Sequence, residues 1–320
     1  MRCSTAARRA SRMRSRTVPV LICAVNRGLR RQWKSGAVKN KTCMLGAAGR
    51  CVKREIRAKT TRSGIGYREE FEALLVRIAD AADAIAMRHF RSAELQRERK
   101  RDGTIVTAAD KAIEEMARKL VTESGRNLDV LGEEFGGDEG TGATRLIIDP
   151  IDGTEEFSRG IPTFGTLLGI EEGGEIVAGL ASAPALGGRW SAYRGEGAWR
   201  DGRRLAVSKV AHLKDAMVFS NGFGDGKGSQ ASERIRRLGE AARKSRGIGG
   251  FWQHTLVAEG AIEAAMDLRS QAWDLAPLLL LVEEAGGRST TLTGERSIYA
   301  GHLISSNGLI HDEVLELLRR

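Results

Sequence analysis

The chain has 320 residues, enough for one large domain or two modest ones. Its net charge of +10 is uneven, because residues 1–66 hold 18 of the 51 Lys and Arg residues but a single acid, Glu55. The remaining residues carry 33 basic and 40 acidic side chains, which argues against a nucleic-acid-binding surface on the body of the protein and suits a site that collects divalent cations.

The cysteines and histidines exclude two further kinds of site. All four cysteines lie in the first 66 residues, so a disulfide framework or a cysteine-based zinc site in the rest of the chain is excluded. The five histidines show no metal-ligand spacing. Each is interpreted as a surface or packing residue.

Residues 1–66 are rich in Arg and poor in acids, and three interpretations remain open. They are an organelle transit peptide, a basic arm for anionic partners, or a segment outside the functional protein. The apolar run at 18–25 is too short to span a membrane. We expect a disordered basic tail without a role in the chemistry and a cytoplasmic protein with no membrane partner. A transit peptide would move it to a plastid or another organelle.

The folded part is expected to begin near Tyr67. Apolar residues recur at helical spacing over 68–90, which predicts an amphipathic helix. A short strand from Thr104 then turns into a second helix over 109–123, and Asp110 lies at this junction. An aspartate at a helix start has an ordinary role too, because it complements the helix dipole.

Further strands are expected from the composition and the turn residues that separate them. They lie at 128–131, 145–148, 163–171, 175–181, 189–193 and 197–199. The pattern of predicted elements changes near residue 207. We place there the boundary between an N-terminal α+β lobe (67–207) and a C-terminal α/β lobe (208–320). In the second lobe we expect strands at 215–221 and 302–306, and helices at 230–244, 253–265, 274–286 and 311–318.

The strongest chemical signal is the segment DPIDGT at 149–154. An apolar run ends in Asp149, and a second carboxylate, Asp152, follows after two intervening residues, one of them Pro150. Gly153 lets the backbone approach a ligand closely, and a helix starting there would offer free N–H groups to an anion. Such a pattern indicates divalent metal ions that bridge protein and phosphate, although on its own it is equally typical of a turn.

Two further stretches favour the metal site. The sequence GEE at 132–134 follows an apolar segment, and WD at 273–274 precedes another. With DPIDGT at these separations, they resemble the inositol monophosphatase family of magnesium-dependent phosphatases over roughly residues 70–318. Three stretches look most like its histidinol-phosphate phosphatase branch: RGIPTFGTLLGI, GLASAPALGGRWSAYRGEGAWRDG and SSNGLIHDEVL.

The resemblance implies a fold and a reaction. The fold is an α/β (α+β) layered α-β-α-β-α sandwich. The reaction is Mg²⁺-dependent hydrolysis of L-histidinol phosphate to L-histidinol and phosphate, a step of histidine biosynthesis. Two alternatives stay open: an inositol-1-phosphate or broad-specificity small-molecule phosphatase, and a non-catalytic metal- or phosphate-binding module. No predicted site residue is lost, which favours catalysis. The partner is a small phosphate ester, and the resemblance allows a homodimer.

The resemblance also implies two or three Mg²⁺ ions per site. One ion would lie between Glu133, Asp149 and the backbone carbonyl of Ile151. A second would lie between Asp149, Asp152 and Asp274, so that Asp149 bridges the two ions.

The catalytic and substrate contacts follow from the same resemblance. Glu133 and Thr154 would orient the nucleophilic water, and Asp110, in the context VTAAD, would hold Thr154. The substrate contacts would be Glu133, Asp152, Gly153, Thr154, Asp267 and Asp274, with the phosphate on the N–H groups of Gly153 and Thr154.

Substrate choice rests on two positions. Asp267 lies seven residues before Asp274, where the family keeps an acid that faces the leaving alcohol. It would bind inositol hydroxyls or the ammonium of histidinol, and the alternative is an ordinary surface aspartate. The chain departs from the branch at Gly250, where an acid usually stands before an aromatic residue, so the amine- or imidazole-binding part of the pocket stays open.

Overall fold

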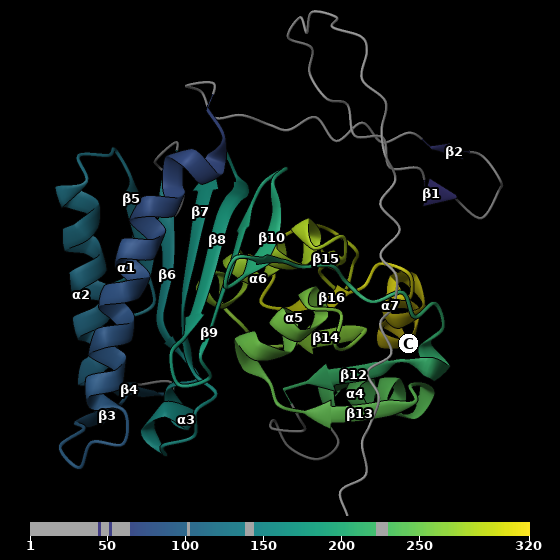
Figure 1. Ribbon diagram of the computed structural model, residues 1–320. Coiled ribbons are helices and arrows are strands. Elements are labelled where there is room, and N and C mark those ends of the chain that lie inside the picture. Colours follow the sequence, from purple (N-terminus) through teal and green to yellow (C-terminus); the bar gives the residue numbers. More distant parts are fainter. Residues whose placement is uncertain (1–43, 46–50, 53–64, 101–102, 138–143, 222–229) are drawn as a thin grey trace, which may run out of the picture. The chain divides into compact units, whose positions relative to one another are not determined.

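A computed structural model describes residues 44–45, 51–52, 65–100, 103–137, 144–221 and 230–320. The chain divides into two units, Met1–Glu55 and Ile56–Arg320. In the first unit, β1 (Met44–Leu45) pairs antiparallel with β2 (Cys51–Val52). The basic segment 1–66 otherwise lies almost entirely outside the described residues, so its role stays a prediction. All other elements belong to the second unit (Figure 1).

The larger sheet of the second unit has the strand order β11-β10-β9-β8-β7-β6-β5. Its strands are β5 (Asp129–Gly132), β6 (Thr144–Asp152), β7 (Gly165–Glu172), β8 (Glu175–Ala183), β9 (Gly188–Tyr193), β10 (Gly197–Arg200) and β11 (Arg203–Arg204). Among the described strands of this sheet, β5 and β6 pair in parallel, and the other neighbours pair antiparallel. The helices α1 (Tyr67–His89) and α2 (Ala108–Glu123) cover one face (Figure 1). A hairpin of β3 (Arg97–Arg99) and β4 (Ile105–Thr107) connects them, and α3 (Thr154–Ser158) follows β6.

The smaller sheet has the order β13-β12-β14-β16-β15. Its strands are β12 (Met217–Ser220), β13 (Lys244–Gly247), β14 (Ala264–Asp267), β15 (Arg288–Thr290) and β16 (Leu303–Ser306). A short 3₁₀ turn, Leu213–Asp215, precedes it. The associated helices are α4 (Gln230–Ala241), α5 (Gly250–Ala258), α6 (Ala272–Glu284) and α7 (His311–Arg319).

Alternation along the strands builds three apolar layers, because successive side chains of a strand point to opposite faces. In β6, Leu146 and Ile148 pack with α1 and α2, whereas Ile147 joins the core that contains α5 and α6. In β14, Ala265 joins that same core, and Ala264 packs on the other side with α4 and α7. Helices therefore cover both outer faces and fill the space between the sheets. The predicted α-β-α-β-α sandwich is confirmed.

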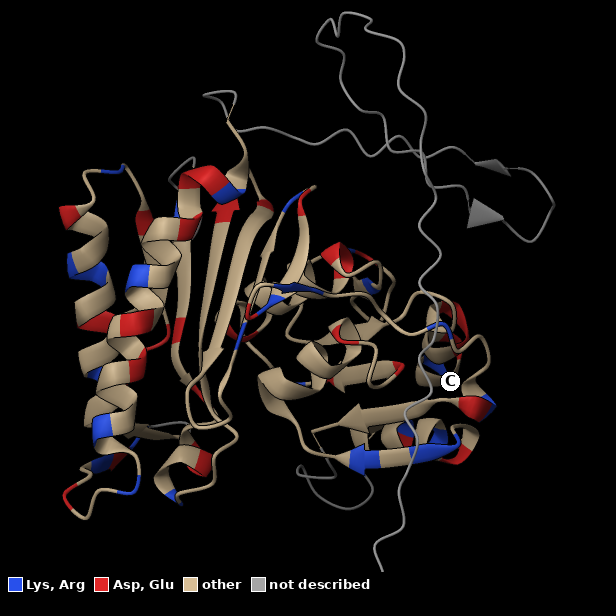
Figure 2. Cartoon of the chain, viewed as in Figure 1, with Lys and Arg blue, Asp and Glu red and all other residues tan. Residues whose placement is uncertain are grey.

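Charges follow these layers. Figure 2 shows charged residues along α1 and α2, each of which buries only one face, while α6 carries a continuous apolar run and is largely buried. Within the described part of the chain, no helix is both long enough and apolar enough to cross a membrane.

One predicted helix is wrong in part. A helix was expected over 253–265, but α5 ends at Ala258, and the strand β14 begins at Ala264. Gly260, with φ +73°, adopts the left-handed conformation that ends many helices. The strands β13, β14 and β15 were not predicted, because segments of three or four residues show too little alternation to be recognised without their sheet partners.

Candidate metal centre

Strand β6 delivers two carboxylates to one place because it is irregular. Asp149 and Asp152 are three residues apart, so a regular strand would point them to opposite faces. The pairing of β6 with β7 shifts register between these two positions, and such a bulge re-aims a side chain. Pro150 lies within the shift, and its carbonyl accepts a hydrogen bond from Thr166 Oγ1 at 2.7 Å. Both aspartates therefore face the same site.

A third carboxylate comes from the start of α6. Asp274 is the third residue of this helix, and its Oδ2 accepts a hydrogen bond from the backbone N–H of Gln271 at 2.7 Å. Ligand oxygens of Asp149, Asp152 and Asp274 all lie within 4.8 Å of one another. The three aspartates thus form one acidic cluster, although Asp149 and Asp274 are 125 residues apart in the sequence.

The cluster is electrostatically unfavourable as it stands. Burial, followed by repulsion from Glu133 and Asp274, raises the pKa of Asp149 well above its ordinary range. Burial and Asp274 do the same to the pKa of Asp152. Burial and Glu133 raise the pKa of Asp274 to about 7. A divalent cation would remove this repulsion.

The cluster fits such a cation. Asp149 is 2% exposed, and its Oδ1 is a buried oxygen that has no hydrogen-bond partner among the described residues. Buried carboxylate oxygens are ordinarily paired, so this one needs a donor or an ion. Hard oxygen donors from a few carboxylates are the ligands that Mg²⁺ takes from proteins.

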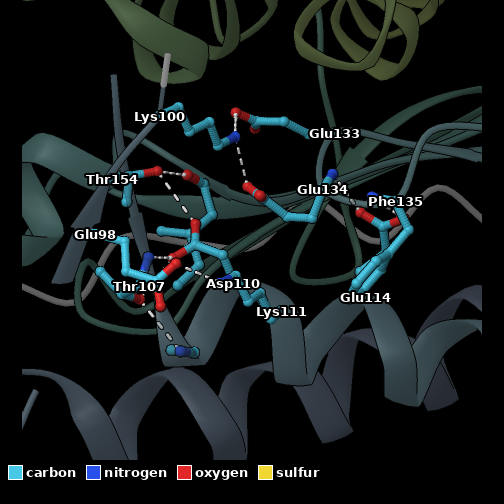
Figure 3. Close-up of polar contacts among 12 residues, drawn as sticks. Glu98, Lys100, Thr107, Asp110, Lys111, Glu114, Glu133, Glu134, Phe135 and Thr154 are labelled. Carbon is cyan, nitrogen blue, oxygen red and sulfur yellow. Dashed lines mark hydrogen bonds and ion pairs between the residues drawn. The ribbon is translucent and has the colours of Figure 1, made fainter. Parts of the chain in front are cut away.

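Glu133 borders the cluster without joining it. It lies in the turn after β5, where Lys100 Nζ contacts Glu133 Oε1 at 2.7 Å and Glu134 Oε1 at 2.8 Å (Figure 3). Partial burial opposes the charge on Lys100, but the two carboxylates outweigh it and raise the pKa of the ammonium. Lys100 therefore neutralises this side of the site. Nothing in the charged sequence 94–103 singles it out.

Glu114 on α2 shapes the turn that carries Glu133. Its buried carboxylate accepts the backbone N–H of Glu134 at 2.7 Å and that of Phe135 at 3.3 Å (Figure 3). Arg118 Nε binds the same carboxylate at 3.0 Å. Glu114 could not be predicted from the sequence, because a helical glutamate carries no signal that it will reach a loop.

Asp110 and Thr154 meet as the VTAAD context predicted. Asp110 is fully buried at the start of α2, where its Oδ2 accepts the N–H of Thr107 at 2.8 Å and the Thr107 hydroxyl at 2.5 Å. Its Oδ1 lies 3.2 Å from Thr154 Oγ1, which also lies 2.9 Å from the carbonyl oxygen of Ile151 (Figure 3). Burial, with a contribution from Glu133, raises the pKa of Asp110 to about 6. The carboxylate is therefore mostly ionised at neutral pH and accepts from Thr154.

Replacing Asp110 by Asn should lower kcat by roughly 10²-fold, the scale of a lost proton-transfer or positioning contact. The Thr107 donors would hold the amide oxygen, so the amide NH₂ would face Thr154 and donate to it. The Thr154 hydroxyl would then lose the carboxylate to which it donates while it accepts a hydrogen bond from water. Steady-state phosphate release measures the change, with Thr154→Ser as the control, because Ser keeps the hydroxyl. An Asp110→Asn enzyme as fast as the control would contradict this role.

Gly153 brings the backbone close to the site. It precedes α3 with φ +81°, and a Cβ there would lie 2.8 Å from the carbonyl oxygen of Thr163. Only glycine fits such a turn without strain. The first N–H groups of the following helix lack intrahelical partners, as an anion site requires.

The surroundings of Gly250 explain why no acidic side chain stands at this position. The N–H of the next residue, Phe251, donates to Asp152 Oδ2 at 2.9 Å at the start of α5. Gly250 has φ +62°, and a Cβ at this position would lie 2.8 Å from the same oxygen. An acidic side chain here would displace a member of the acidic cluster. Gly250 therefore keeps this place beside Asp152 free of a side chain.

Asp267 is not a surface residue. It ends β14 and is 3% exposed, and its Oδ2 lies 3.1 Å from Nε2 of the buried His254 on α5. Asp152 and Asp274 owe their raised pKa values first to burial, and the charge of Asp267 adds to both. The carboxylate thus adjoins the acidic cluster. His254 was interpreted as a packing residue, and its spacing from Asp267 carries no recognisable signal.

Comparison with known proteins identifies the family of the chain. The model of the inositol monophosphatase family matches residues 67–320. The chain is 40% identical over 250 residues to a histidinol-phosphatase of Mycobacterium tuberculosis, covering 77% of this chain and 96% of the relative. It is 38% identical over 252 residues to a histidinol-phosphatase of Streptomyces coelicolor, covering 76% and 94%. An IMPase structure from Thermotoga maritima superposes with a TM-score of 0.70 at 29% identity, covering 78% of this chain and 97% of that one. The chain therefore belongs to the inositol monophosphatase family.

Proposed function

We propose that this protein is a Mg²⁺-dependent phosphomonoesterase that hydrolyses L-histidinol phosphate to L-histidinol and phosphate, a reaction of histidine biosynthesis. The observation that carries the proposal is the cluster of Asp149, Asp152 and Asp274, with its orphaned Asp149 oxygen. The 40% identity to a histidinol-phosphatase supports the substrate.

The acidic cluster would hold the metal. Asp149, Asp152 and Asp274 are the proposed ligands of one ion, and Glu133, Asp149 and the carbonyl of Ile151 those of another. When bound, Mg²⁺ supplies positive charge against the phosphoryl and leaving-group oxygens and makes a nearby water a better nucleophile. Glu133 must exchange its contact with Lys100 for this role, and Glu134 stays to hold the ammonium.

Thr154 and Asp110 would direct the attacking water. The Thr154 hydroxyl donates to Asp110 Oδ1, which leaves a lone pair of Thr154 Oγ1 to accept a hydrogen bond from the attacking water. Glu133 is the second acceptor on that side. The water oxygen forms the new bond to phosphorus, the bond from phosphorus to the alcohol oxygen breaks, and the alcohol oxygen takes up a proton. The N–H groups of Gly153 and Thr154 hold the phosphate.

A second candidate within the same chemistry is inositol-1-phosphate hydrolysis. The 29% identity to the Thermotoga maritima IMPase favours it, and Asp267 suits hydroxyls as well as an ammonium. A non-catalytic role fits less well, because the chain keeps every proposed ligand as well as Thr154 and Asp110, and Asp149, Asp152 and Asp274 lie together.

The test is phosphate release by the full chain from L-histidinol phosphate and from inositol 1-phosphate, each with Mg²⁺ and with EDTA. We expect Mg²⁺-dependent turnover with a preference for histidinol phosphate of roughly 10²-fold, the discrimination that a few polar contacts provide. A preference for inositol 1-phosphate would overturn the substrate and keep the phosphatase. Turnover in EDTA would overturn the metal.

A further inference from the structure

Helix α5 contacts two acids of the site. At its start, the N–H of Phe251 donates to Asp152 Oδ2 at 2.9 Å. One turn later, Nε2 of His254 lies 3.1 Å from Asp267 Oδ2. The alternation of β14 points Asp267 to the same face as Ala265, which packs in the core containing α5. A single helix therefore links a proposed metal ligand to the acid on the leaving-group side.

A chain of buried hydroxyls continues behind His254. Its Nδ1 lies 2.8 Å from Ser305 Oγ, and that oxygen lies 2.9 Å from Ser289 Oγ. His254 and Ser305 are fully buried, and Ser289 is 1% exposed. These groups cannot be solvated, so each must satisfy the next.

The proton positions follow from this chain. With Asp267 as a carboxylate, which only accepts, His254 Nε2 must donate. In the neutral imidazole, Nδ1 then accepts a hydrogen bond from Ser305. Ser305 then donates to His254, and Ser289 donates to Ser305. The imidazole is neutral in this assignment, so the pair of His254 and Asp267 carries one negative charge.

One carboxylate oxygen of Asp267 is available for a further hydrogen bond. Among the described residues, His254 is its one side-chain hydrogen-bond partner, through Oδ2, and the Asp267 side chain is 5% exposed. Asp267 also adjoins the acidic cluster, as its effect on Asp152 and Asp274 shows. Its second oxygen is left for a donor on the substrate.

We infer that His254 is a positioning residue for the leaving group: it holds the Asp267 carboxylate so that the free oxygen meets the ammonium of an amino-alcohol phosphate. The inference rests on the proposed function and deepens it. A neutral imidazole leaves the carboxylate charge uncompensated, which favours a cationic leaving group over a neutral polyol. Gly250 leaves room for no acid in that part of the site, so Asp267 supplies the charge.

The fold offers a matched control on the opposite face of the same strands. His311 of α7 is also fully buried, and its ring nitrogens lie 2.8 Å from the hydroxyls of Thr290 and Ser306. These two residues neighbour Ser289 and Ser305 on β15 and β16. His311 thus repeats the hydroxyl contacts of His254 without the Asp267 contact.

The experiment compares His254→Phe, His254→Gln and His311→Phe in the full chain, with L-histidinol phosphate and with p-nitrophenyl phosphate, which carries no ammonium. His254→Phe should raise KM for histidinol phosphate about tenfold or more, the effect of about 1.4 kcal/mol. Its kcat, and its kcat/KM for p-nitrophenyl phosphate, should change less than about threefold, because the metal site is untouched. His254→Gln keeps an N–H donor and should restore most of the KM.

His311→Phe should lower the thermal midpoint without raising KM. An equal loss on both esters in His254→Phe, no rescue by Gln, or the same KM change in His311→Phe would overturn the inference. Should the wild type cleave other esters but not histidinol phosphate, the proposed function fails. The same variants are then compared on O-phosphoethanolamine and glycerol 1-phosphate, and an unchanged preference between these two would overturn the inference separately.

Discussion

Replacing Asp149 by Asn should abolish phosphate release while the protein stays folded. Asp149 is the most buried member of the acidic cluster, and it is the proposed ligand shared by both ions. We expect a loss of at least ~10³-fold in kcat, because charge stabilisation at the phosphoryl group is the largest contribution to such a reaction. Phosphate release at saturating Mg²⁺ measures it.

The control separates chemistry from folding. Glu155→Gln removes a charge directly after the DPIDGT motif, but Glu155 is exposed on α3 and pairs with Arg159 at 2.6 Å. It should keep nearly full activity. The Asp149→Asn protein should unfold at no lower temperature than the wild type in EDTA, because burial opposes ionisation at this position. Turnover by Asp149→Asn within about tenfold of the control would contradict the shared-ligand assignment.

Removing divalent ions should make the free energy of unfolding fall as pH rises from about 4 to about 7, and Mg²⁺ should reverse the loss. Burial raises the pKa of Asp274 to about 7, against an ordinary value of 3.8. Between these values the folded state keeps a proton that the unfolded state has released, so rising pH favours unfolding. Burial also raises the pKa of Glu134 to about 7, so this residue likewise lowers the free energy of unfolding as pH rises.

Urea unfolding in EDTA at pH 5 and pH 8, for wild type and Asp274→Asn, measures this linkage. One pKa unit corresponds to about 1.4 kcal/mol, so the wild type should lose up to a few kcal/mol more than the variant across this range. Glu155→Gln should behave like the wild type. Equal pH dependence in wild type and Asp274→Asn would refute the coupling between the acidic cluster and folding.

The sequence by itself determined the fold class and identified the carboxylate residues of the candidate site. The period of α1, the alternating strands and the turn residues between them were readable because each is a local consequence of burying one face. The motifs GEE, DPIDGT and WD contain Glu133, Asp149, Asp152 and Asp274. These residues could be identified as candidate metal ligands because residue type and order alone indicate that chemistry.

Only the tertiary structure decided which of these side chains meet. The register shift between β6 and β7 turns Asp149 and Asp152 to one face, and a bulge exists only where two strands pair. Lys100 reaches Glu133 and Glu134 because the β3–β4 hairpin brings it there. Long-range contacts of this kind leave no trace in local spacing.

The contact between His254 and Asp267 depends on tertiary structure most of all. His254 and Asp267 are 13 residues apart, on a helix and a strand whose boundary the sequence misplaced. Their contact requires that α5 end at Ala258 and that β14 point Asp267 toward it. Burying a carboxylate is costly unless it has a hydrogen-bond or charged partner. Packing between elements supplies that partner here, rather than neighbours along the chain.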